Sequence, residues 1–338
     1  MSEISPHIKS EKRGFLGLLT LNRPNALNAL DHGMIGAISA QLQAWATDDA
    51  IKTVAIRGEG PRAFCSGGDI RAVQQAIVAG SDSGVDLLRD EYRMNALIGA
   101  YPKPYVALIH GICMGGGAGV SVHGKYRLAD ASLSFAMPET GIGFIPDVGA
   151  SFFLSRLPDE MGMYLGLTGA PIGLGDALDT GLMTHAVAQG DFDAVIDALA
   201  EGRDFASFAR KREAGALAVH RKRIATIFAG HSVEAILERL DRDGSDFARD
   251  TAQTIRTRSP TSLKLVFRQL RAARSLNLRQ CLVLEFRLAN RVLFAHDFRE
   301  GVRAALVDKD RNPKWQPSSL AGVGDLDAFF VPLQNELF

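Results

Sequence analysis

Residues 110–119 read His110-Gly111-Ile112-Cys113-Met114-Gly115-Gly116-Gly117-Ala118-Gly119. They follow an apolar run typical of a strand and precede a predicted helix. Three adjacent glycines cost conformational entropy, so this backbone must approach another group closely or adopt unusual dihedral angles. The free N–H groups at a helix start could hold a phosphate or the developing oxyanion of an acyl transfer. Tight packing of helix on strand explains the glycines equally well.

Strand and helix patterns alternate around this stretch. Short apolar runs bounded by Gly, Pro or Asp predict strands at residues 15–21, 53–57, 105–110, 126–129 and 132–136. Helical spacing places the apolar residues between 34 and 45 on one face, with Asp31 as the N-cap. A further helix is predicted at 85–100, before Pro102. This alternation indicates an α/β fold.

The pattern changes after about residue 190, where strand-like runs disappear. Helical patterns follow at 192–199, 233–240, 261–273 and 278–295, and the Ser-Pro-Thr-Ser sequence at 259–262 is typical of a helix start. The many arginines of this part predict a solvated face with salt bridges. We therefore expect two domains: a core over residues 1–200, and a helical region over residues 201–338 that packs on it.

The charge balance excludes several classes of protein. Lys plus Arg number 38 and Asp plus Glu number 38, so the formal net charge is zero, which argues against a general nucleic-acid binder. No apolar run approaches the roughly 18–20 residues that span a bilayer, and the N-terminal residues lack the apolar core of a signal peptide. The three cysteines form no CxxC pair, so no metal site is expected. These features predict a cytoplasmic protein with neither nucleic-acid nor membrane partners.

A second turn-forming cluster reads Cys65-Ser66-Gly67-Gly68-Asp69. Asp69 could cap a helix that starts at Ile70, or the turn could expose another backbone N–H. Two N–H groups from separate loops are what an oxyanion hole requires. Nucleotide fingerprints fit neither glycine cluster. No Walker pattern occurs, and a G-x-G-x-x-A match at residues 58–63 leads into this turn instead of a helix.

Two carboxylates, Glu139 and Asp147, lie in an apolar segment rich in Gly and Pro at residues 137–149. Carboxylates in such surroundings are expected to be partly buried. They could act as base, nucleophile or acid, or could serve only as helix caps or structural hydrogen-bond partners. No G-x-S-x-G elbow of a serine hydrolase occurs, and Cys65 and Cys113 are predicted to be buried core thiols.

Four motifs occur in order along the chain. They are Leu21-Asn22-Arg23-Pro24-Asn25-Ala26-Leu27-Asn28, Ala63-Phe64-Cys65-Ser66-Gly67-Gly68-Asp69-Ile70, His110-Gly111 with Gly115-Gly116-Gly117, and Pro138-Glu139. Together they resemble the crotonase (enoyl-CoA hydratase/isomerase) superfamily. Segments 137–149, 296–303 and 308–315 further resemble its 3-hydroxyisobutyryl-CoA hydrolase branch. The likeness covers about residues 12 to 320 and implies a crotonase-like spiral of β-β-α turns, a helical C-terminal region and acyl-CoA thioester substrates.

The resemblance also implies roles for single residues. The N–H groups of Gly68 and Gly116 would form the oxyanion hole. Glu139 and Asp147 would carry the chemistry, and Glu91 would contact the substrate hydroxyl. The CoA site would be lined by Asn25, Ala26, Ser66, Asp69 and Ile70. No cofactor is implied, because CoA is part of the substrate.

One position departs from the pattern of the enoyl-CoA hydratases, which use two glutamates to activate water. The first of these glutamates falls on Gly119 here, while Glu139 holds the place of the second. Hydration adds a proton to one carbon and water to the next, so the missing carboxylate weakens the hydratase interpretation. Asp147, eight residues after Glu139, matches an additional acid of the hydrolase branch.

The predicted function is hydrolysis of 3-hydroxyisobutyryl-CoA to 3-hydroxyisobutyrate and free CoA, a step of valine breakdown. Glu139 would either activate water or attack the thioester directly, and Asp147 would position water or protonate the leaving thiolate. An enoyl-CoA hydratase or another crotonase-type enzyme is the alternative within enzymes. A non-catalytic acyl-CoA-binding protein is the alternative outside them. Many crotonases form trimers or hexamers, so a homo-oligomer is an open expectation.

Overall fold

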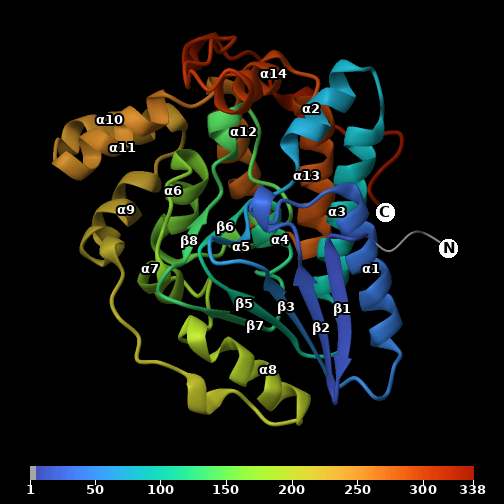
Figure 1. Cartoon of the computed structure of the whole chain (residues 1–338). Helices are drawn as coiled ribbons and strands as arrows, with labels where there is room; N and C mark the ends of the chain where they lie inside the picture. The colour runs from blue at the N-terminus through green and yellow to red at the C-terminus, as the bar shows by residue number, and fades with distance from the viewer. Residues whose placement is uncertain (1–4) are drawn as a thin grey trace. The chain divides into compact units, whose positions relative to one another are not determined.

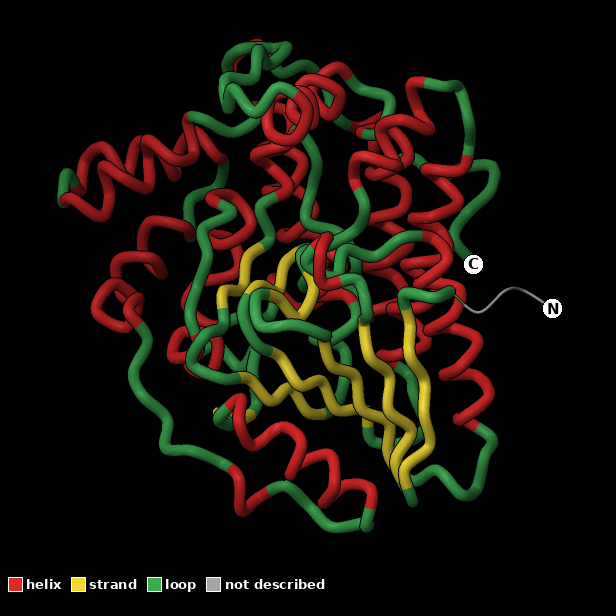
Figure 2. Tube along the Cα trace, viewed as in Figure 1, coloured by secondary structure: helices red, strands yellow, loops and turns green. Residues whose placement is uncertain are grey.

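The strands form two sheets (Figure 2). The structure, a computed structural model, describes residues 5–338. The larger sheet has the order β1 (Ile8–Arg13), β2 (Leu16–Leu21), β3 (Thr53–Gly58), β5 (Tyr105–Ile109), β7 (Tyr126–Ala129) and β9 (His185–Ala186). The smaller sheet contains β4 (Ala63–Cys65), β6 (Ile112–Met114) and β8 (Ser134–Ala136). From β2 to β9 the strands of the larger sheet run parallel, while β1 pairs antiparallel with β2.

Helices occupy much of the remaining chain (Figure 1). They are α1 (His32–Ala46), α2 (Ile70–Val78), α3 (Ser83–Gly99), α4 (Gly116–Gly119), α5 (Ala150–Leu154), α6 (Met161–Thr168), α7 (Leu174–Asp179), α8 (Phe192–Ala200), α9 (Arg221–Phe228), α10 (Val233–Asp243), α11 (Asp246–Arg256), α12 (Pro260–Ala273), α13 (Leu278–Val292), α14 (His296–Val302) and α15 (Asp327–Phe330). Two short 3₁₀ turns, η1 (Pro24–Ala26) and η2 (Glu139–Ile142), carry residues of the predicted site.

Strand β2 shows why the larger sheet is buried on both faces. All six of its residues are buried, as expected for a parallel strand covered by helices on both sides. Leu16 shares a hydrophobic cluster with Leu199 of α8. Gly17 points to the opposite face, where an added Cβ atom would lie 2.6 Å from the Trp45 ring of α1. The close approach of α1 therefore requires glycine at position 17.

Three successive segments repeat the same β-β-helix order. Strands β3 and β4 precede α2, β5 and β6 precede α4, and β7 and β8 precede η2. In each pair the first strand joins the larger sheet and the second joins the smaller one. The chain thus winds in the predicted spiral of β-β-α turns, and the predicted α/β fold class is confirmed.

The described chain divides into two compact units. The first runs to Asp69 and adds residues 90–135 and 172–218, while the second comprises residues 70–89, 136–171 and 219–338 and is mostly helical. Within the second unit, α5 and α6 pack against α12, and α5 also packs against α13. The predicted boundary at residue 200 does not coincide with this division, because these two early helices pack with the C-terminal ones.

Side-chain caps fix where four C-terminal helices begin. Ser232, Ser245 and Ser259 each accept a hydrogen bond from the backbone N–H three residues later, and they start α10, α11 and α12. Pro260 takes the first position of α12, where a backbone N–H has no helical partner to lose. Asn277 starts α13 with a capping box. The start of α12 agrees with the Ser-Pro signal in the sequence.

Candidate functional site

Two glycine amides lie side by side in the first unit. Gly68 follows β4, and Gly116 begins α4. A Cβ atom added to Gly116 would lie 3.2 Å from the Gly68 nitrogen, and one added to Gly67 would lie 3.7 Å from the Gly116 nitrogen. Within residues 5–338, neither the Gly68 nor the Gly116 N–H donates a hydrogen bond to the protein. The structure therefore brings the two predicted oxyanion donors together from separate loops.

Backbone contacts fix the loop that follows β4. The Leu30 N–H donates to the Gly67 carbonyl at 2.8 Å, and the Leu30 carbonyl accepts from the Asp69 N–H at 2.8 Å. Gly67 has a φ of +116°, which glycine adopts without strain. A Cβ atom added to Gly117 would lie 2.3 Å from the Cys65 carbonyl oxygen, so the glycine run also lets α4 approach β4. Close packing, one explanation of the glycines, is therefore observed, and the two amides without an acceptor within residues 5–338 are compatible with the other.

Helix α3 places Glu91 next to the amide pair. One carboxylate oxygen of Glu91 lies 2.5 Å from the point where a Gly116 Cβ atom would be, and the other lies 3.9 Å from the corresponding point of Gly68. Glu91 is only 2% exposed, and the next residue, Tyr92, is buried as well. A side chain at position 116 would therefore displace Glu91. Its burial also excludes a merely solvated charge on the surface of the helix.

Asn95, one turn further along α3, is a second buried polar residue that sequence reasoning missed. Residues four apart on a helix share a face, so Asn95 lies on the same face as Glu91. It is fully buried, and within residues 5–338 neither atom of its amide has a hydrogen-bond partner. Buried polar groups are normally paired, so this amide marks a contact point for water or for a polar group of a ligand. A polar residue four positions after Glu91 on a predicted helix was the available signal.

Two further hydrogen bonds join the loop before α1 to the loop after β4. The Ser66 N–H donates to the Leu27 carbonyl at 3.0 Å. The Arg23 guanidinium donates to the Asp69 carboxylate at 3.0 Å. Two motifs that are far apart in the sequence are thereby joined in the first unit, and Asp69 is the ion-pair partner of Arg23.

The remaining residues predicted to line a CoA site lie in two places. Asn25 and Ala26 belong to η1, and Asn25 is exposed. Asn25 lines a cavity of about 160 Å³, together with the turn at residues 59–63. Ile70 begins α2 and belongs to the second unit. Asn25 and Ala26 thus lie in the first unit and Ile70 in the second, and the CoA contact of all three stays a prediction.

In the second unit, Glu139 begins η2 and is buried. The Thr140 carbonyl of η2 accepts a hydrogen bond from the Ser259 N–H at 3.2 Å. Helix α14 packs so closely that a Cβ atom added to Gly143 would lie 2.1 Å from the Asp297 carbonyl oxygen. The short helix that carries Glu139 is therefore held by α12 on one side and by α14 on another.

Asp297 ties these two supporting helices together. Its buried carboxylate accepts hydrogen bonds from the Ser259 hydroxyl at 2.6 Å and from the Gln316 N–H at 2.8 Å. A ring nitrogen of His296 lies 3.1 Å from the same carboxylate. These donors satisfy a charge that would be costly to bury alone. The segment at 296–303, part of the family likeness, thus supports η2.

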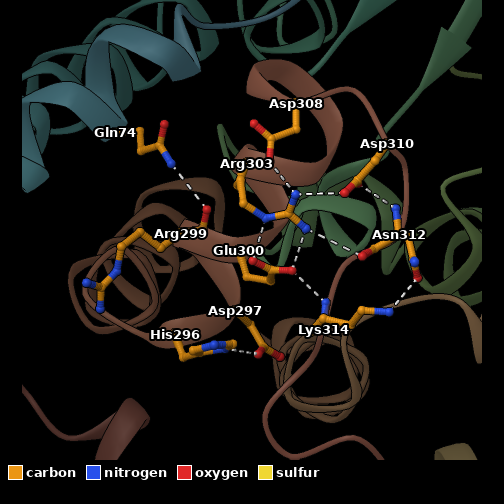
Figure 3. Close-up of polar contacts among 10 residues, drawn as sticks. All are labelled: Gln74, His296, Asp297, Arg299, Glu300, Arg303, Asp308, Asp310, Asn312 and Lys314. Atoms are coloured by element: carbon orange, nitrogen blue, oxygen red, sulfur yellow. Dashed lines mark hydrogen bonds and ion pairs between the residues drawn. The ribbon is translucent and has the colours of Figure 1, made fainter.

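A cluster of charges around Arg303 follows in the same unit (Figure 3). The guanidinium pairs with Glu300 at 2.8 Å, with Asp308 at 2.6 Å and with Asp310 at 2.8 Å. The hydrogen bond from Arg303 holds the pKa of Glu300 at about 2. The Lys314 N–H also donates to Glu300 at 2.7 Å. The cluster anchors the chain that follows α14.

Asp147, the second predicted acid, is 6% exposed and lies in a tight turn of the same unit as Glu139. Its carbonyl accepts a hydrogen bond from the Ala150 N–H at 2.7 Å. The two residues between them, Val148 and Gly149, have φ angles of +54° and +85°. Positive φ at both central positions is typical of a type I′ turn, and it is rare for a β-branched residue. The turn leads directly into α5.

The two thiols of the first unit are buried, as predicted. Burial raises the pKa of Cys113 to about 12 and raises the pKa of Cys65 further, so neither is a thiolate at neutral pH. No group of three or more His, Cys, Asp or Glu side chains within residues 5–338 is arranged to hold a metal ion. Over the same residues, no helix has the length and apolar character needed to cross a membrane.

Known proteins resemble this chain over almost its whole length. Residues 16–330 match the family model described as enoyl-CoA hydratase/isomerase. A curated protein of Xenopus tropicalis, named 3-hydroxyisobutyryl-CoA hydrolase, mitochondrial, is 46% identical over 341 residues, which covers 96% of this chain and 88% of the relative. The Homo sapiens protein of the same name is 41% identical over 340 residues, with the same shares covered.

Solved structures confirm the crotonase-like fold. A crystal structure named as a carnitinyl-CoA dehydratase from Mycobacterium thermoresistibile superposes with a TM-score of 0.95 at 39% identity, covering 99% of both chains. One named as an enoyl-CoA hydratase from Rhodobacter sphaeroides gives a TM-score of 0.92 at 38% identity, covering 97% of this chain and 98% of the other.

The comparison also corrects the predicted cytoplasmic location. The curated relatives from frogs, zebrafish, chicken and mammals are all named as mitochondrial proteins, which contradicts that prediction. The prediction rested on general features of composition, and these say little about where a folded enzyme is delivered.

Proposed function

We propose that this chain, which belongs to the enoyl-CoA hydratase/isomerase family, hydrolyses 3-hydroxyisobutyryl-CoA to 3-hydroxyisobutyrate and free CoA. Curated relatives of that name support the proposal through 41–46% identity over 96% of the chain. The paired N–H groups of Gly68 and Gly116 carry it, because a thioester carbonyl needs such a pair when it is attacked. Valine breakdown is the pathway proposed for this step.

The amide pair polarises the thioester carbonyl. Attack on this carbonyl moves negative charge onto its oxygen, and two preorganised N–H donors stabilise that charge. Removing one such donor typically costs roughly 2.7–4 kcal/mol of transition-state stabilisation. Glu91, beside Gly116, accepts a hydrogen bond from the hydroxyl group of the acyl chain, which accounts for a hydroxylated substrate.

Glu139 and Asp147 supply the acid–base or nucleophilic chemistry. A carboxylate either activates water for attack on the carbonyl, or attacks it directly and forms a mixed anhydride that water then cleaves. The second carboxyl group positions that water or protonates the leaving thiolate of CoA. Burial of both side chains supports these roles, because electrostatic interactions are stronger away from water.

A hydratase is the second candidate function, since the two similar crystal structures carry hydratase and dehydratase names. Gly119 argues against it. This residue ends α4 and has no carboxylate, whereas the enoyl-CoA hydratases that the chain resembles use two glutamates. Glu139 fills only the place of the second glutamate, so hydration of a double bond would lack one of the two carboxyl groups that it needs.

The test is release of free thiol from 3-hydroxyisobutyryl-CoA, 3-hydroxypropionyl-CoA and crotonyl-CoA by the purified protein. A hydrolase produces a thiol signal with the first two substrates. A hydratase consumes the double bond of crotonyl-CoA and releases no thiol. Tight binding of all three esters without turnover would identify an acyl-CoA-binding protein and would overturn the proposal.

A further inference from the structure

We propose that Glu285 and Gln269 are positioning residues that clamp the turn carrying Asp147 from two helices. The inference rests on the proposed function, because it assigns these side chains a part in the same hydrolysis. Glu285 lies on α13 and Gln269 on α12, and both are fully buried. Neither residue belongs to any motif of the family likeness. All the residues of this clamp lie in the second unit.

Glu285 holds the chain that follows Asp147. One carboxylate oxygen accepts a hydrogen bond from the Gly149 N–H at 2.7 Å. The other accepts from the Ser151 N–H at 2.8 Å and from the Ser151 hydroxyl at 2.5 Å. Three donors from one short segment converge on a single side chain, so this segment has little freedom while Glu285 stays in place.

Gln269 holds the chain that precedes Asp147. Its amide nitrogen donates a hydrogen bond to the Pro146 carbonyl at 2.7 Å. Asp147 therefore lies between two fixed points, one residue after the first and two residues before the second. The supporting side chains are more than one hundred residues away in the sequence.

The turn needs this support because its backbone is strained. Val148 has a φ of +54°, a conformation that β-branched residues rarely adopt. Such strained residues persist only where the surrounding structure over-determines them, and they cluster at functional sites. The clamp keeps the Asp147 carboxyl group in one orientation, and a misplacement of about 1 Å can cost about 10²-fold in rate.

The charges near Glu285 give the clamp a distinctive pH response. Burial, with a further contribution from the Asp147 charge, raises the pKa of Glu285 to about 8, against the lowering effect of its three hydrogen bonds. Cys281 on the same helix is a further ionisable neighbour, and its thiol also lies near Arg156. At neutral pH Glu285 is therefore largely uncharged. Above about pH 8 Glu285 ionises and places a negative charge near Asp147.

The decisive variant is Glu285→Gln in the full-length protein, assayed by thiol release from 3-hydroxyisobutyryl-CoA. The clamp predicts a fall in kcat of about 10-fold to 10²-fold with KM nearly unchanged. The wild-type kcat should decline above about pH 8, and the variant should lose this decline because residue 285 no longer ionises. Hydrogen exchange at the Gly149 and Ser151 amides should become faster.

Two further variants keep the test valid if Glu285→Gln does not fold. Ser151→Ala removes the hydroxyl bond alone, and Gln269→Met removes the bond to Pro146 with little change in volume. Each should lower kcat without raising KM. Asn277→Ala is the matched control, because it removes the N-cap of α13 without touching the turn, and its kcat should equal that of the wild type.

The outcomes separate this inference from the proposed function. If the wild type releases thiol and Asp147→Asn does not, while the clamp variants keep the wild-type kcat, pH profile and hydrogen exchange, the clamp is wrong and the hydrolase stands. If the wild type releases no thiol from any ester, the proposed function fails. Unchanged exchange at residues 149 and 151 in Glu285→Gln would then overturn the clamp as well.

Discussion

The two units present their predicted site residues in opposite ways. In the first unit the predicted donors are the backbone amides of Gly68 and Gly116, and at position 116 an added Cβ atom would lie 2.5 Å from a Glu91 carboxylate oxygen. In the second unit the predicted reactive groups are buried side chains, Glu139 and Asp147, and other side chains from distant helices hold their segments. We therefore expect the activity to be sensitive to added atoms in the first unit, and to lost hydrogen bonds and charges in the second.

The largest effect is expected from Glu139→Gln, which removes the charge and basicity of one acid and keeps its shape. We expect kcat to fall by roughly 10²–10⁴-fold, the range that general acid–base catalysis contributes, with binding of the acyl-CoA largely intact. Thiol release and equilibrium binding measure the two effects separately. Glu238→Gln, an exposed position on α10, is the control and should behave as the wild type. Near-normal turnover in Glu139→Gln would remove this carboxylate from the chemistry.

The difference between the units explains how much of the site could be predicted from the sequence. Gly68 and Gly116 lie in glycine clusters, of which the second follows a predicted strand, and such clusters are local signals that need no knowledge of the fold. The two acids were also visible, because carboxylates are unusual in an apolar segment rich in Gly and Pro. The spiral of β-β-α turns was predicted through the family likeness, since strand and helix patterns alone indicate no more than an α/β fold.

The supports of the second unit could not be predicted in the same way. Glu285 lies in an amphipathic pattern, where a charged residue is usually read as exposed, although Cys281 and Leu288 place it on the buried face. Its partners are far away in the sequence, so no local pattern reports them. Strand β1 was missed for a related reason. Its charged, mostly exposed residues lack an alternation of apolar and polar side chains.

Gly116→Ala tests the sensitivity of the first unit to added atoms. The new methyl group would lie 2.5 Å from a Glu91 carboxylate oxygen and 3.2 Å from the Gly68 nitrogen, so it should disturb both the substrate contact and the amide pair. We expect kcat/KM to fall by about 10²-fold, comparable to the loss of one oxyanion donor. The matched control is Gly36→Ala on α1, where nothing lies within 4 Å of an added Cβ atom. That substitution should leave kcat unchanged and raise Tm slightly. Wild-type kinetics in Gly116→Ala would show that the amides are not used.

The pH dependence of stability tests the second unit. The pKa of Glu285 is raised from 4.5 to about 8 by burial, so the folded protein holds this proton more tightly than the unfolded chain does. Its contribution to stability is complete below about pH 4.5 and is lost as the pH rises through about 8. A tenfold change in proton affinity corresponds to about 1.4 kcal/mol, so this contribution is a few kcal/mol at most. Between pH 5 and pH 9 the Tm of the wild type should fall further than the Tm of Glu285→Gln. Parallel curves of Tm against pH for the two proteins would contradict the raised pKa.

The smallest expected effect comes from two helix caps of the second unit that differ in what else they bind. Ser245→Ala removes the N-cap of α11, and we expect a loss of about 1 kcal/mol in unfolding free energy with unchanged kcat. Ser259→Ala removes the N-cap of α12 and also a hydrogen bond to the buried Asp297 carboxylate, so its cost should approach about 2 kcal/mol. Because Ser259 and Asp297 support η2, this variant should also lower kcat by a few-fold. Denaturant unfolding and thiol release measure the pair side by side. Equal losses of stability and equal kcat in the two variants would mean that backbone packing alone supports Glu139. Support by side chains from distant helices would then be confined, in the second unit, to the turn that carries Asp147.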